Sequence, residues 1–372
     1  MCYGQRAFRH GGICLKIMPL NHVTARFLCG WSFPGACQTI KHGLTTCILS
    51  QRLHGTGQAV PLRQNLAAGA REMKSMSIDR ERLDSAIADF KDFGVNDAAE
   101  NNIVVSLTSF SERMGTLHYA LFSLLRQTLK PWKVILWLAH DEFPGREQDL
   151  PPAVAALCKN GLEIRWYSNL RQYSKLVPAL RAYPDKIIAV ADDDAFYRRD
   201  WLELLYKDYL ENNRAKMLYA HRAHRIMFGD NGFPLRYEQW EKSDRNKAGA
   251  RYCNFPTGVG GVLYPPGALH EDATNEDIFM RLAPHADDIF YWGMAVLNDT
   301  KIRVINNNQP IVVDINPENN DFSSAAHTLY KINTLQGKND EQFASLLEAY
   351  PEIYLKISIE NRLLDKTENL GR

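Results

Sequence analysis

Four short apolar runs, each separated from the next by a segment of helical periodicity, constrain the fold of this chain more than any other feature. The runs are rich in Val, Ile and Leu, as are strands buried on both faces of a parallel sheet. They span residues 103–107, 133–138, 162–166 and 187–191. The helical segments between them span residues 114–127, 153–159 and 174–182. This alternation predicts an α/β fold with a mostly parallel central sheet flanked by helices, in which ligands lie at the carboxyl ends of the strands.

A second group of elements follows residue 200. We expect helices over residues 201–211, 276–282 and 289–297, and strands over residues 217–221, 259–264 and 301–305. Residues 222–256 are polar and aromatic with weak periodicity, which predicts a substrate-facing loop. We expect a lead-in helix within residues 76–102, the main domain over residues 103–315, and one helix in a C-terminal tail over residues 316–372.

The distribution of charge changes sharply near residue 72. Residues 1–71 hold eight Lys or Arg and no Asp or Glu, whereas the rest of the chain holds 36 basic and 43 acidic side chains. Residues 72–372 therefore carry about 7 net negative charges, which argues against nucleic acid as a bulk electrostatic partner of the main domain.

Residues 1–75 form a basic, Cys-rich extension with five of the seven cysteines. Three interpretations stay open: an organellar-type transit segment, a basic peripheral arm, and an upstream extension before a natural start at Met73 or Met76. We favour the last because the composition changes there. No apolar run is long enough to span a membrane, so only peripheral membrane association is expected. Cys158 and Cys253 are isolated, which predicts reduced core residues of a cytoplasmic protein, and no CxxC pair supports zinc.

Three consecutive carboxylates follow the fourth predicted strand, where a ligand is expected. In an extended segment Asp192 and Asp194 project to one side and Asp193 to the other. Two carboxylates on one side can hold a divalent cation, and their hard oxygen atoms favour Mg²⁺ or Mn²⁺. Such a cation would bridge a diphosphate and stabilise its negative charge as it leaves. The alternative is an acidic loop whose charges are solvated.

At this point the chain resembles a known family. The runs VVSLTSFSERMGTLHYALFSLLRQTLKPWKVILWL and IIAVADDDAFYRRDWLELLY resemble the nucleotide-sugar-binding half of GT-A glycosyltransferases, in particular the bacterial family 2-like enzymes. The resemblance implies a Rossmann-like GT-A domain with a nucleotide-sugar half over residues 103–215 and an acceptor half over residues 216–315. The aspartate-any-aspartate motif of that family maps onto Asp192 and Asp194, which would hold the metal and, with Asp193, the donor diphosphate.

The resemblance also places the nucleoside. Such enzymes seat the base and ribose on the loop after the first strand, which here contains Thr108, Ser109 and Phe110. Hydroxyl groups and backbone amides there can hydrogen-bond the base, and Phe110 can stack on it. Arg113 can meet a phosphate as a bidentate donor. The alternative is a surface Arg113 beside a helix-capping Ser111.

Three more positions are candidates with alternatives of equal or greater weight. Asp141 follows the second strand. It either accepts a hydrogen bond from the ribose or base, or is an exposed turn residue. The family often has an aspartate right at the end of this strand, where this chain has Ala139 and His140. Lys175 opens the helix before the fourth strand and either approaches the diphosphate or is solvated. His327 matches a late metal-binding histidine of some GT-A enzymes, although a lone histidine more often has another role.

The second half would supply the acceptor site. The glycine-rich segment 258–262 can lie close to a sugar ring because it has few Cβ atoms, or it is a plain turn. Asp287 and Asp288 precede an aromatic helix, as the acidic pair of inverting GT-A enzymes does, which makes Asp288 the expected general base and Asp287 the fallback. Both acids also suit the start of a helix. Tyr291 and Trp292 could stack on a sugar, but helical aromatics more often belong to the core.

These features together favour a metal-dependent enzyme of the hexosyltransferase type. It would move a sugar from a nucleotide-diphosphate donor to a hydroxyl of a glycan or lipid-linked acceptor, with inversion, at the inner face of the membrane or in the cytoplasm. The bacterial resemblance implies synthesis of cell-envelope polysaccharide or lipopolysaccharide. One alternative is a nucleotidyltransferase on a related sheet, although the loop after the first strand has no glycine before Gly115 to hold a triphosphate. The other is a non-catalytic glycan-binding relative.

Overall fold

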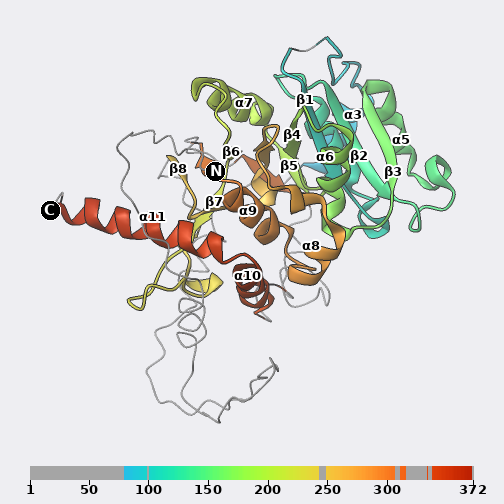
Figure 1. The fold of residues 1–372 in the computed structure, drawn as a ribbon. Helices are drawn as coiled ribbons and strands as arrows, with labels where there is room; N and C mark the ends of the chain where they lie inside the picture. The colour runs from blue at the N-terminus through green and yellow to red at the C-terminus, as the bar shows by residue number, and fades with distance from the viewer. Residues whose placement is uncertain are drawn as a thin grey trace, which may run out of the picture. The chain divides into compact units, whose positions relative to one another are not determined.

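The computed structural model describes residues 79–98, 100–242, 249–305, 311–315, 333 and 337–370, with side chains as far as residue 364. The predicted extension over residues 1–75 and His327 lie outside these ranges. The helices are α3 (Arg80–Ala88), α4 (Leu117–Leu125), α5 (Pro152–Ala155), α6 (Val177–Ala182), α7 (Trp201–Glu211), α8 (Glu276–Leu282), α9 (Asp287–Leu297), α10 (Lys338–Ala349) and α11 (Pro351–Leu370) (Figure 1).

The strands are β1 (Ile103–Thr108), β2 (Lys133–Ala139), β3 (Leu162–Tyr167), β4 (Ile187–Val190), β5 (Ala195–Tyr197), β6 (Leu218–Ala220), β7 (Ala223–Arg225), β8 (Gly249–Arg251), β9 (Asn254–Pro256), β10 (Val262–Tyr264), β11 (Ile302–Val304) and β12 (Val312–Asp314). Among the described residues, eight of them form one sheet in the order β3-β2-β1-β4-β10-β6-β11-β8. The first four strands are mutually parallel, and β10 runs antiparallel between β4 and β6. The predicted α/β fold with a mostly parallel central sheet flanked by helices is therefore confirmed.

Side chains alternate between the two faces of this sheet and build a core on each. Along β1, Val104 enters one core, whereas Ile103, Val105 and Leu107 enter the other. Helices α6, α8, α9, α10 and α11 cover the face of Val104, and α4, α5 and α7 cover the opposite face. The acidic loop after β4 is thus anchored between two packed layers of helices.

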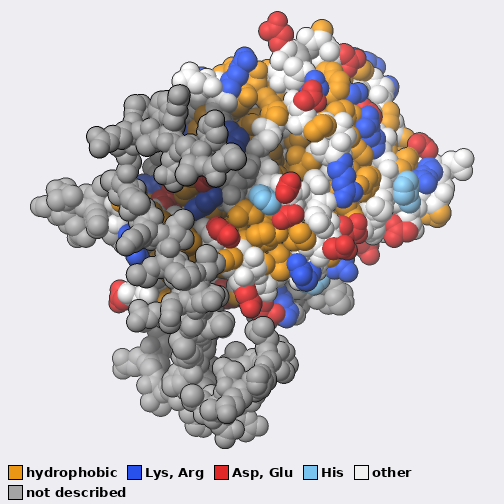
Figure 2. Space-filling view, in the orientation of Figure 1, with side chains coloured by type: hydrophobic (Ala, Val, Ile, Leu, Met, Phe, Trp, Pro, Cys, Tyr) orange, Lys and Arg blue, Asp and Glu red, His pale blue; other side chains and the backbone are white. Residues whose placement is uncertain are grey.

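The outer surface of this part of the chain carries charges of both signs. On the face drawn in Figure 2, acidic and basic side chains are interspersed over hydrophobic ones across the coloured residues. None of the helices that the structure describes has the length and apolar composition that a membrane crossing requires.

Three local expectations need correction. Residues 222–256 are not one loop, because β7 pairs with β9. The aromatic side chains of this segment also pack together: the ring centres of Trp240 and Phe255 lie 5.2 Å apart, and both side chains are buried. The tail holds two helices, α10 and α11, where one was predicted. Cys253 is a buried free cysteine as expected, but Cys158 is exposed on the short 3-10 helix Ala156–Asn160.

One tight contact fixes the glycine-rich segment before β10. The indole Nε1–H of Trp201 donates a hydrogen bond of 2.9 Å to the Gly260 carbonyl, and Gly261 has a φ of +90°. A Cβ added at Gly261 would lie 2.3 Å from Trp201 Nε1. Gly261 therefore serves both a left-handed backbone conformation and a close approach to a buried ring.

Substitutions at Gly261 and at a control glycine should separate the cost of the backbone conformation from the cost of crowding against Trp201. We expect Gly261→Ala to lower the free energy of unfolding by about 3 kcal/mol, since strain and overpacking add. Gly267→Ala is the matched control, because Gly267 has a φ of +67° with open space around its Cβ position; it should cost about 1 kcal/mol. Urea unfolding monitored by circular dichroism measures both, and equal losses would contradict the close approach to Trp201.

Candidate active site

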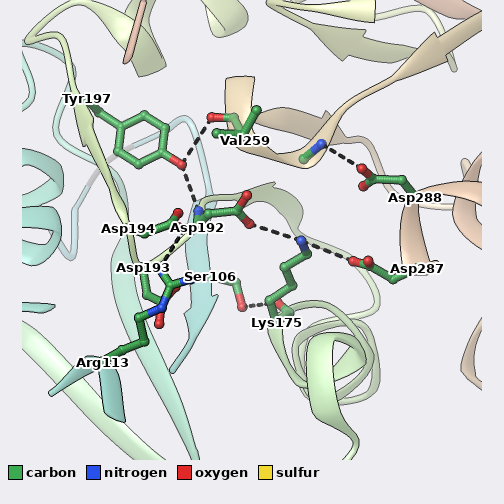
Figure 3. A network of polar contacts seen from close by, with 11 residues as sticks. Ser106, Arg113, Lys175, Asp192, Asp193, Asp194, Tyr197, Val259, Asp287 and Asp288 are labelled. Carbon is green, nitrogen blue, oxygen red and sulfur yellow. Dashed lines mark hydrogen bonds and ion pairs between the residues drawn. The ribbon is translucent and has the colours of Figure 1, made fainter. Parts of the chain in front are cut away.

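The three consecutive aspartates lie where parallel strands end, but not in the expected geometry. Strand β4 ends at Val190, and residues 193 and 194 form a turn that leads into β5. The strict alternation expected for an extended segment therefore does not hold: Asp193 and Asp194 both reach Arg113, and Asp192 reaches Lys175. Figure 3 shows the resulting network.

Lys175 connects the two halves of the site. Its Nζ lies 3.0 Å from Asp192 Oδ1 and 3.0 Å from Asp287 Oδ2, so one ammonium group bridges the acidic loop after β4 and the start of α9. The Lys175 side chain is only 11% exposed, and that of Asp287 is 10% exposed. The solvated alternative for Lys175 is therefore wrong.

The backbone of Lys175 is held in place by hydrogen bonds to the central sheet. Lys175 ends the 3-10 helix Arg171–Lys175, and its carbonyl accepts a hydrogen bond of 2.6 Å from the hydroxyl of Ser106 on β1. The same hydroxyl accepts a bond of 2.9 Å from the indole nitrogen of Trp137 on β2. Ser106 is fully buried, so two central strands fix the position of the lysine.

Arg113 compensates the other two aspartates. It belongs to the 3-10 helix Ser111–Arg113 after β1, and its Nη1 lies 2.6 Å from Asp194 Oδ2 and 3.6 Å from Asp193 Oδ1. Asp193 also accepts a hydrogen bond of 2.5 Å from the Ser109 hydroxyl. The surface alternative for Arg113 does not hold, and Ser111 makes no capping bond to this helix, which begins after Phe110.

The acidic pair of the second half faces the same site. Asp287 and Asp288 open α9, yet neither caps it, because the N-cap residue is Ala286 and no side chain there bonds the helix. Instead, Asp288 Oδ2 accepts a hydrogen bond of 3.1 Å from the Gly258 backbone N–H. A Cβ at Gly258 would lie 3.0 Å from Lys175 Nζ and 3.1 Å from Asp288 Oδ1, so only glycine fits between them without displacing either group.

The electrostatics of the cluster show an excess of buried negative charge. The pKa of Asp288 is raised to about 7, first by burial and then by the charge of Asp287. The pKa of Asp193 is raised to about 6, chiefly by burial, against the opposing charge of Arg113. Burial and the neighbouring charge of Asp192 raise the pKa of Asp194. Burial alone would lower the pKa of Lys175, but the surrounding carboxylates hold it well above its usual value.

The remaining candidate residues differ in where they lie relative to the acidic cluster. The Thr108 hydroxyl donates a bond of 2.9 Å to the Trp137 carbonyl, so it holds the loop after β1. Phe110 is 39% exposed, with the Arg113 guanidinium 5.6 Å from its ring centre. Asp141 is exposed in a turn. Tyr291 and Trp292 are buried in the core, as the more frequent role of helical aromatics predicts.

Sequence reasoning missed two contributors. The Tyr197 hydroxyl accepts a hydrogen bond of 2.7 Å from the Asp192 backbone N–H, and the ring is fully buried, so it fixes the acidic turn. Glu142, rather than Asp141, reaches the loop after β1, where its carboxylate accepts a bond of 3.2 Å from the Ser111 N–H. Proximity to the predicted loops was the only signal for either residue.

Comparisons with known proteins give a likeness of fold. No family model matches the chain, and no curated protein matches it. Similar solved structures include TarS from S. aureus in complex with UDP, with 11% identity, a TM-score of 0.41, and coverage of 73% of this chain and 92% of that chain. Another is the mannosyltransferase PcManGT from Pyrobaculum calidifontis in complex with GDP-Man and Mn²⁺, with 14% identity, a TM-score of 0.37, and coverage of 82% and 90%. The solved structures that resemble this chain in fold thus include a mannosyltransferase.

A third similar structure is a cytidylyltransferase from Leptospira borgpetersenii serovar Hardjo-bovis. It shares 12% identity at a TM-score of 0.32, with coverage of 65% of this chain and 95% of that chain. A likeness at this level is one of general α/β architecture.

Removing the bridging charge tests the energetics of the cluster. Lys175→Met would leave the buried Asp287 carboxylate without its cation, and we expect the free energy of unfolding to fall by about 3 kcal/mol. Lys133→Met is the control, because Lys133 pairs with Glu163 at 2.8 Å while both side chains are more exposed, at 26% and 31%; it should cost less than about 1 kcal/mol. Adding Asp287→Asn to Lys175→Met should restore part of the loss. Equal costs for the two lysine variants in urea unfolding would refute the bridging role.

Proposed function

We propose that this protein is a glycosyltransferase of the hexosyltransferase type, which moves a sugar from a nucleotide-diphosphate donor to a hydroxyl of a glycan or lipid-linked acceptor with inversion. We further propose that it acts in the cytoplasm or at the inner face of the membrane, in the synthesis of cell-envelope polysaccharide or lipopolysaccharide. The observation that carries the reaction is the meeting of two acidic groups at Lys175: Asp192 from the donor half and Asp287 from the acceptor half each lie 3.0 Å from its Nζ.

The charge balance of the site suits a divalent cation together with a diphosphate. Five clustered carboxylates face two cations, Lys175 and Arg113, so the cluster carries an excess of acidic oxygen atoms. Among the described residues no group of three or more His, Cys, Asp or Glu side chains is arranged to hold a metal ion by itself. Asp192 and Asp194 would hold Mn²⁺ or Mg²⁺. When bound, this ion supplies positive charge against the departing diphosphate.

The fixed cations of the chain have a matching role in donor binding. Arg113 and Lys175 each lie beside one of the two proposed metal ligands. Both cationic side chains would donate to phosphate oxygens of the donor, Arg113 as a fork-shaped donor and Lys175 as a point charge. Phe110 has an exposed ring on the loop after β1, where it can stack on the nucleoside base. Thr108 and Ser109 keep that loop in place through their hydrogen bonds.

Asp288 is the proposed general base. Its carboxylate is held by the Gly258 N–H, and the lack of a side chain at Gly258 allows that carboxylate and Lys175 Nζ to keep their positions. The charge of Asp287 is compensated by Lys175, which leaves Asp288 as the acid of the pair that has no ion pair with a cation in the described part of the chain. In the reaction Asp288 takes the proton of the acceptor hydroxyl as its oxygen attacks the sugar carbon and the diphosphate leaves.

Donor binding can be tested by thermal stabilisation. We expect one nucleotide sugar, in a screen of the common ones, to raise the melting temperature in the presence of Mn²⁺ and not in the presence of EDTA. Asp192→Asn and Asp194→Asn should each abolish this shift, because each removes one charged metal ligand. Asp185→Asn, at a carboxylate that is 76% exposed and outside the cluster, should leave it intact. Unchanged stabilisation of both cluster variants would show that the metal assignment is wrong.

The base can be tested separately from donor binding. We expect Asp288→Asn to retain donor binding, since an amide oxygen can still accept from Gly258, and to lose transfer by at least about 100-fold. Because a base acts in its ionised form and the pKa of Asp288 is raised to about 7, wild-type transfer should decline as the pH falls below that value. Asp287→Asn serves as the comparison. If Asp287→Asn abolished transfer while Asp288→Asn retained it, the base assignment would pass to Asp287.

A further inference from the structure

A cleft lies along the outermost strand of the sheet, apart from the acidic cluster. Strand β3 comes first in the sheet order, so among the described strands only β2 pairs with it. The cleft is lined by residues of β2, β3 and α6 and has a volume of about 550 Å³. Its lining is aromatic or aliphatic except for two arginines, Arg165 on β3 and Arg181 on α6. Small-molecule sites commonly combine this size and lining with a few polar groups.

The Arg165 guanidinium is held in one orientation. Its Nε donates a hydrogen bond of 2.5 Å to Glu163 Oε1, and its central carbon lies 5.6 Å from the ring centre of Trp137 and 5.2 Å from that of Tyr183. Within the described part of the chain, its terminal nitrogens Nη1 and Nη2 make no hydrogen bond. The side chain is 34% exposed and lines the cleft. Such a fork of donors matches two oxygen atoms of a carboxylate or phosphate.

Arg181 is the second fixed guanidinium of the cleft. Its Nη1 donates to the Tyr167 hydroxyl on β3, and its Nη2 donates a hydrogen bond of 2.6 Å to the Thr274 carbonyl. These two bonds leave one N–H on each terminal nitrogen for a ligand. Because both arginines are held before a ligand arrives, little side-chain entropy is lost on binding.

The charge balance at this edge of the sheet favours an anion. The Glu163 carboxylate is shared between Lys133 Nζ at 2.8 Å and Arg165 Nε at 2.5 Å. Arg181 forms no ion pair with any of the described residues. One carboxylate thus faces three cations, which leaves an excess of positive charge for a ligand to compensate.

We propose that the cleft binds an acidic sugar, with its carboxylate or phosphate group on Arg165 and Arg181 and its ring against the aromatic lining. A pyranose has apolar C–H faces, which pack on aromatic rings, and a polar rim that carries the acidic group. The half-buried Tyr167 joins the two features, because its ring centre lies 6.2 Å from that of Trp137 and its hydroxyl contacts Arg181. The residues of the acidic cluster do not line the cleft, so an acidic sugar held here is additional to the donor of the proposed reaction.

Calorimetric titration of the full chain in EDTA tests the site with glucuronate and glucose 6-phosphate as probes. We expect both acidic sugars to bind at least about tenfold more tightly than glucose or inorganic phosphate, because only they supply a ring together with an anion. The tighter of the two identifies the acidic group that the cleft prefers. The titrations contain neither a nucleotide sugar nor a divalent cation, so their outcome does not depend on whether the chain transfers sugar.

Variants locate the binding in the cleft. Arg165→Gln and Arg181→Gln should each weaken binding of the acidic sugars by at least about tenfold. Arg126→Gln is the matched control, because the Arg126 guanidinium also lies over two rings, 5.2 Å from Phe122 and 5.6 Å from Phe196, but outside the cleft; it should leave the affinity unchanged. Circular dichroism and melting temperature confirm that each variant is folded.

Four results would overturn the proposal. They are no binding of either acidic sugar, equal affinity for glucose or for inorganic phosphate, affinity unchanged in both cleft variants, and binding that survives Arg165→Gln but is lost in Arg113→Gln. The last result would place the anion in the acidic cluster instead of the cleft.

Discussion

One buried ammonium group decides how the two halves of this site are arranged. Lys175 lies between a carboxylate of the turn after β4 and a carboxylate at the start of α9, with 3.0 Å to each. Its own backbone is fixed by Ser106 on β1, which in turn is fixed by the indole of Trp137 on β2. Three parts of the chain that are distant in sequence thus depend on the placement of one side chain. Because a buried carboxylate is costly without a cation, this arrangement keeps the acids close together.

The same arrangement holds several buried carboxylates close together, where their negative charges repel one another. Crowding and burial raise the pKa values of Asp193, Asp194, Asp287 and Asp288, while Lys175 and Arg113 oppose the effect only in part. A site of this kind gains free energy when additional positive charge enters, and it has poor affinity for a bare diphosphate. Both expectations agree with a donor that binds together with a divalent cation, which is the basis of the proposed glycosyl transfer.

The sequence predicted the scaffold well because its signals were local. Apolar runs of β-branched residues marked β1 to β4 within one or two residues, and the position of the aspartates after β4 indicated the ligand end of the sheet. Contacts between distant segments could not be read in the same way. The ion pair between Lys175 and Asp287 joins residues 112 positions apart, and the buried Tyr197 that holds the Asp192 amide looked like any strand aromatic. The turn at residues 193 and 194 also defeated the alternation rule, which holds only for extended backbone.

The most direct measurement is the position of a bound cation. Crystals grown with Mn²⁺ and UDP or GDP would locate the ion through its anomalous scattering. The account predicts an ion bonded to the carboxylates of both Asp192 and Asp194, with the diphosphate beside Arg113 and Lys175. An ion at an unrelated position, with Asp192 still paired to Lys175 and Asp194 still paired to Arg113, would contradict it.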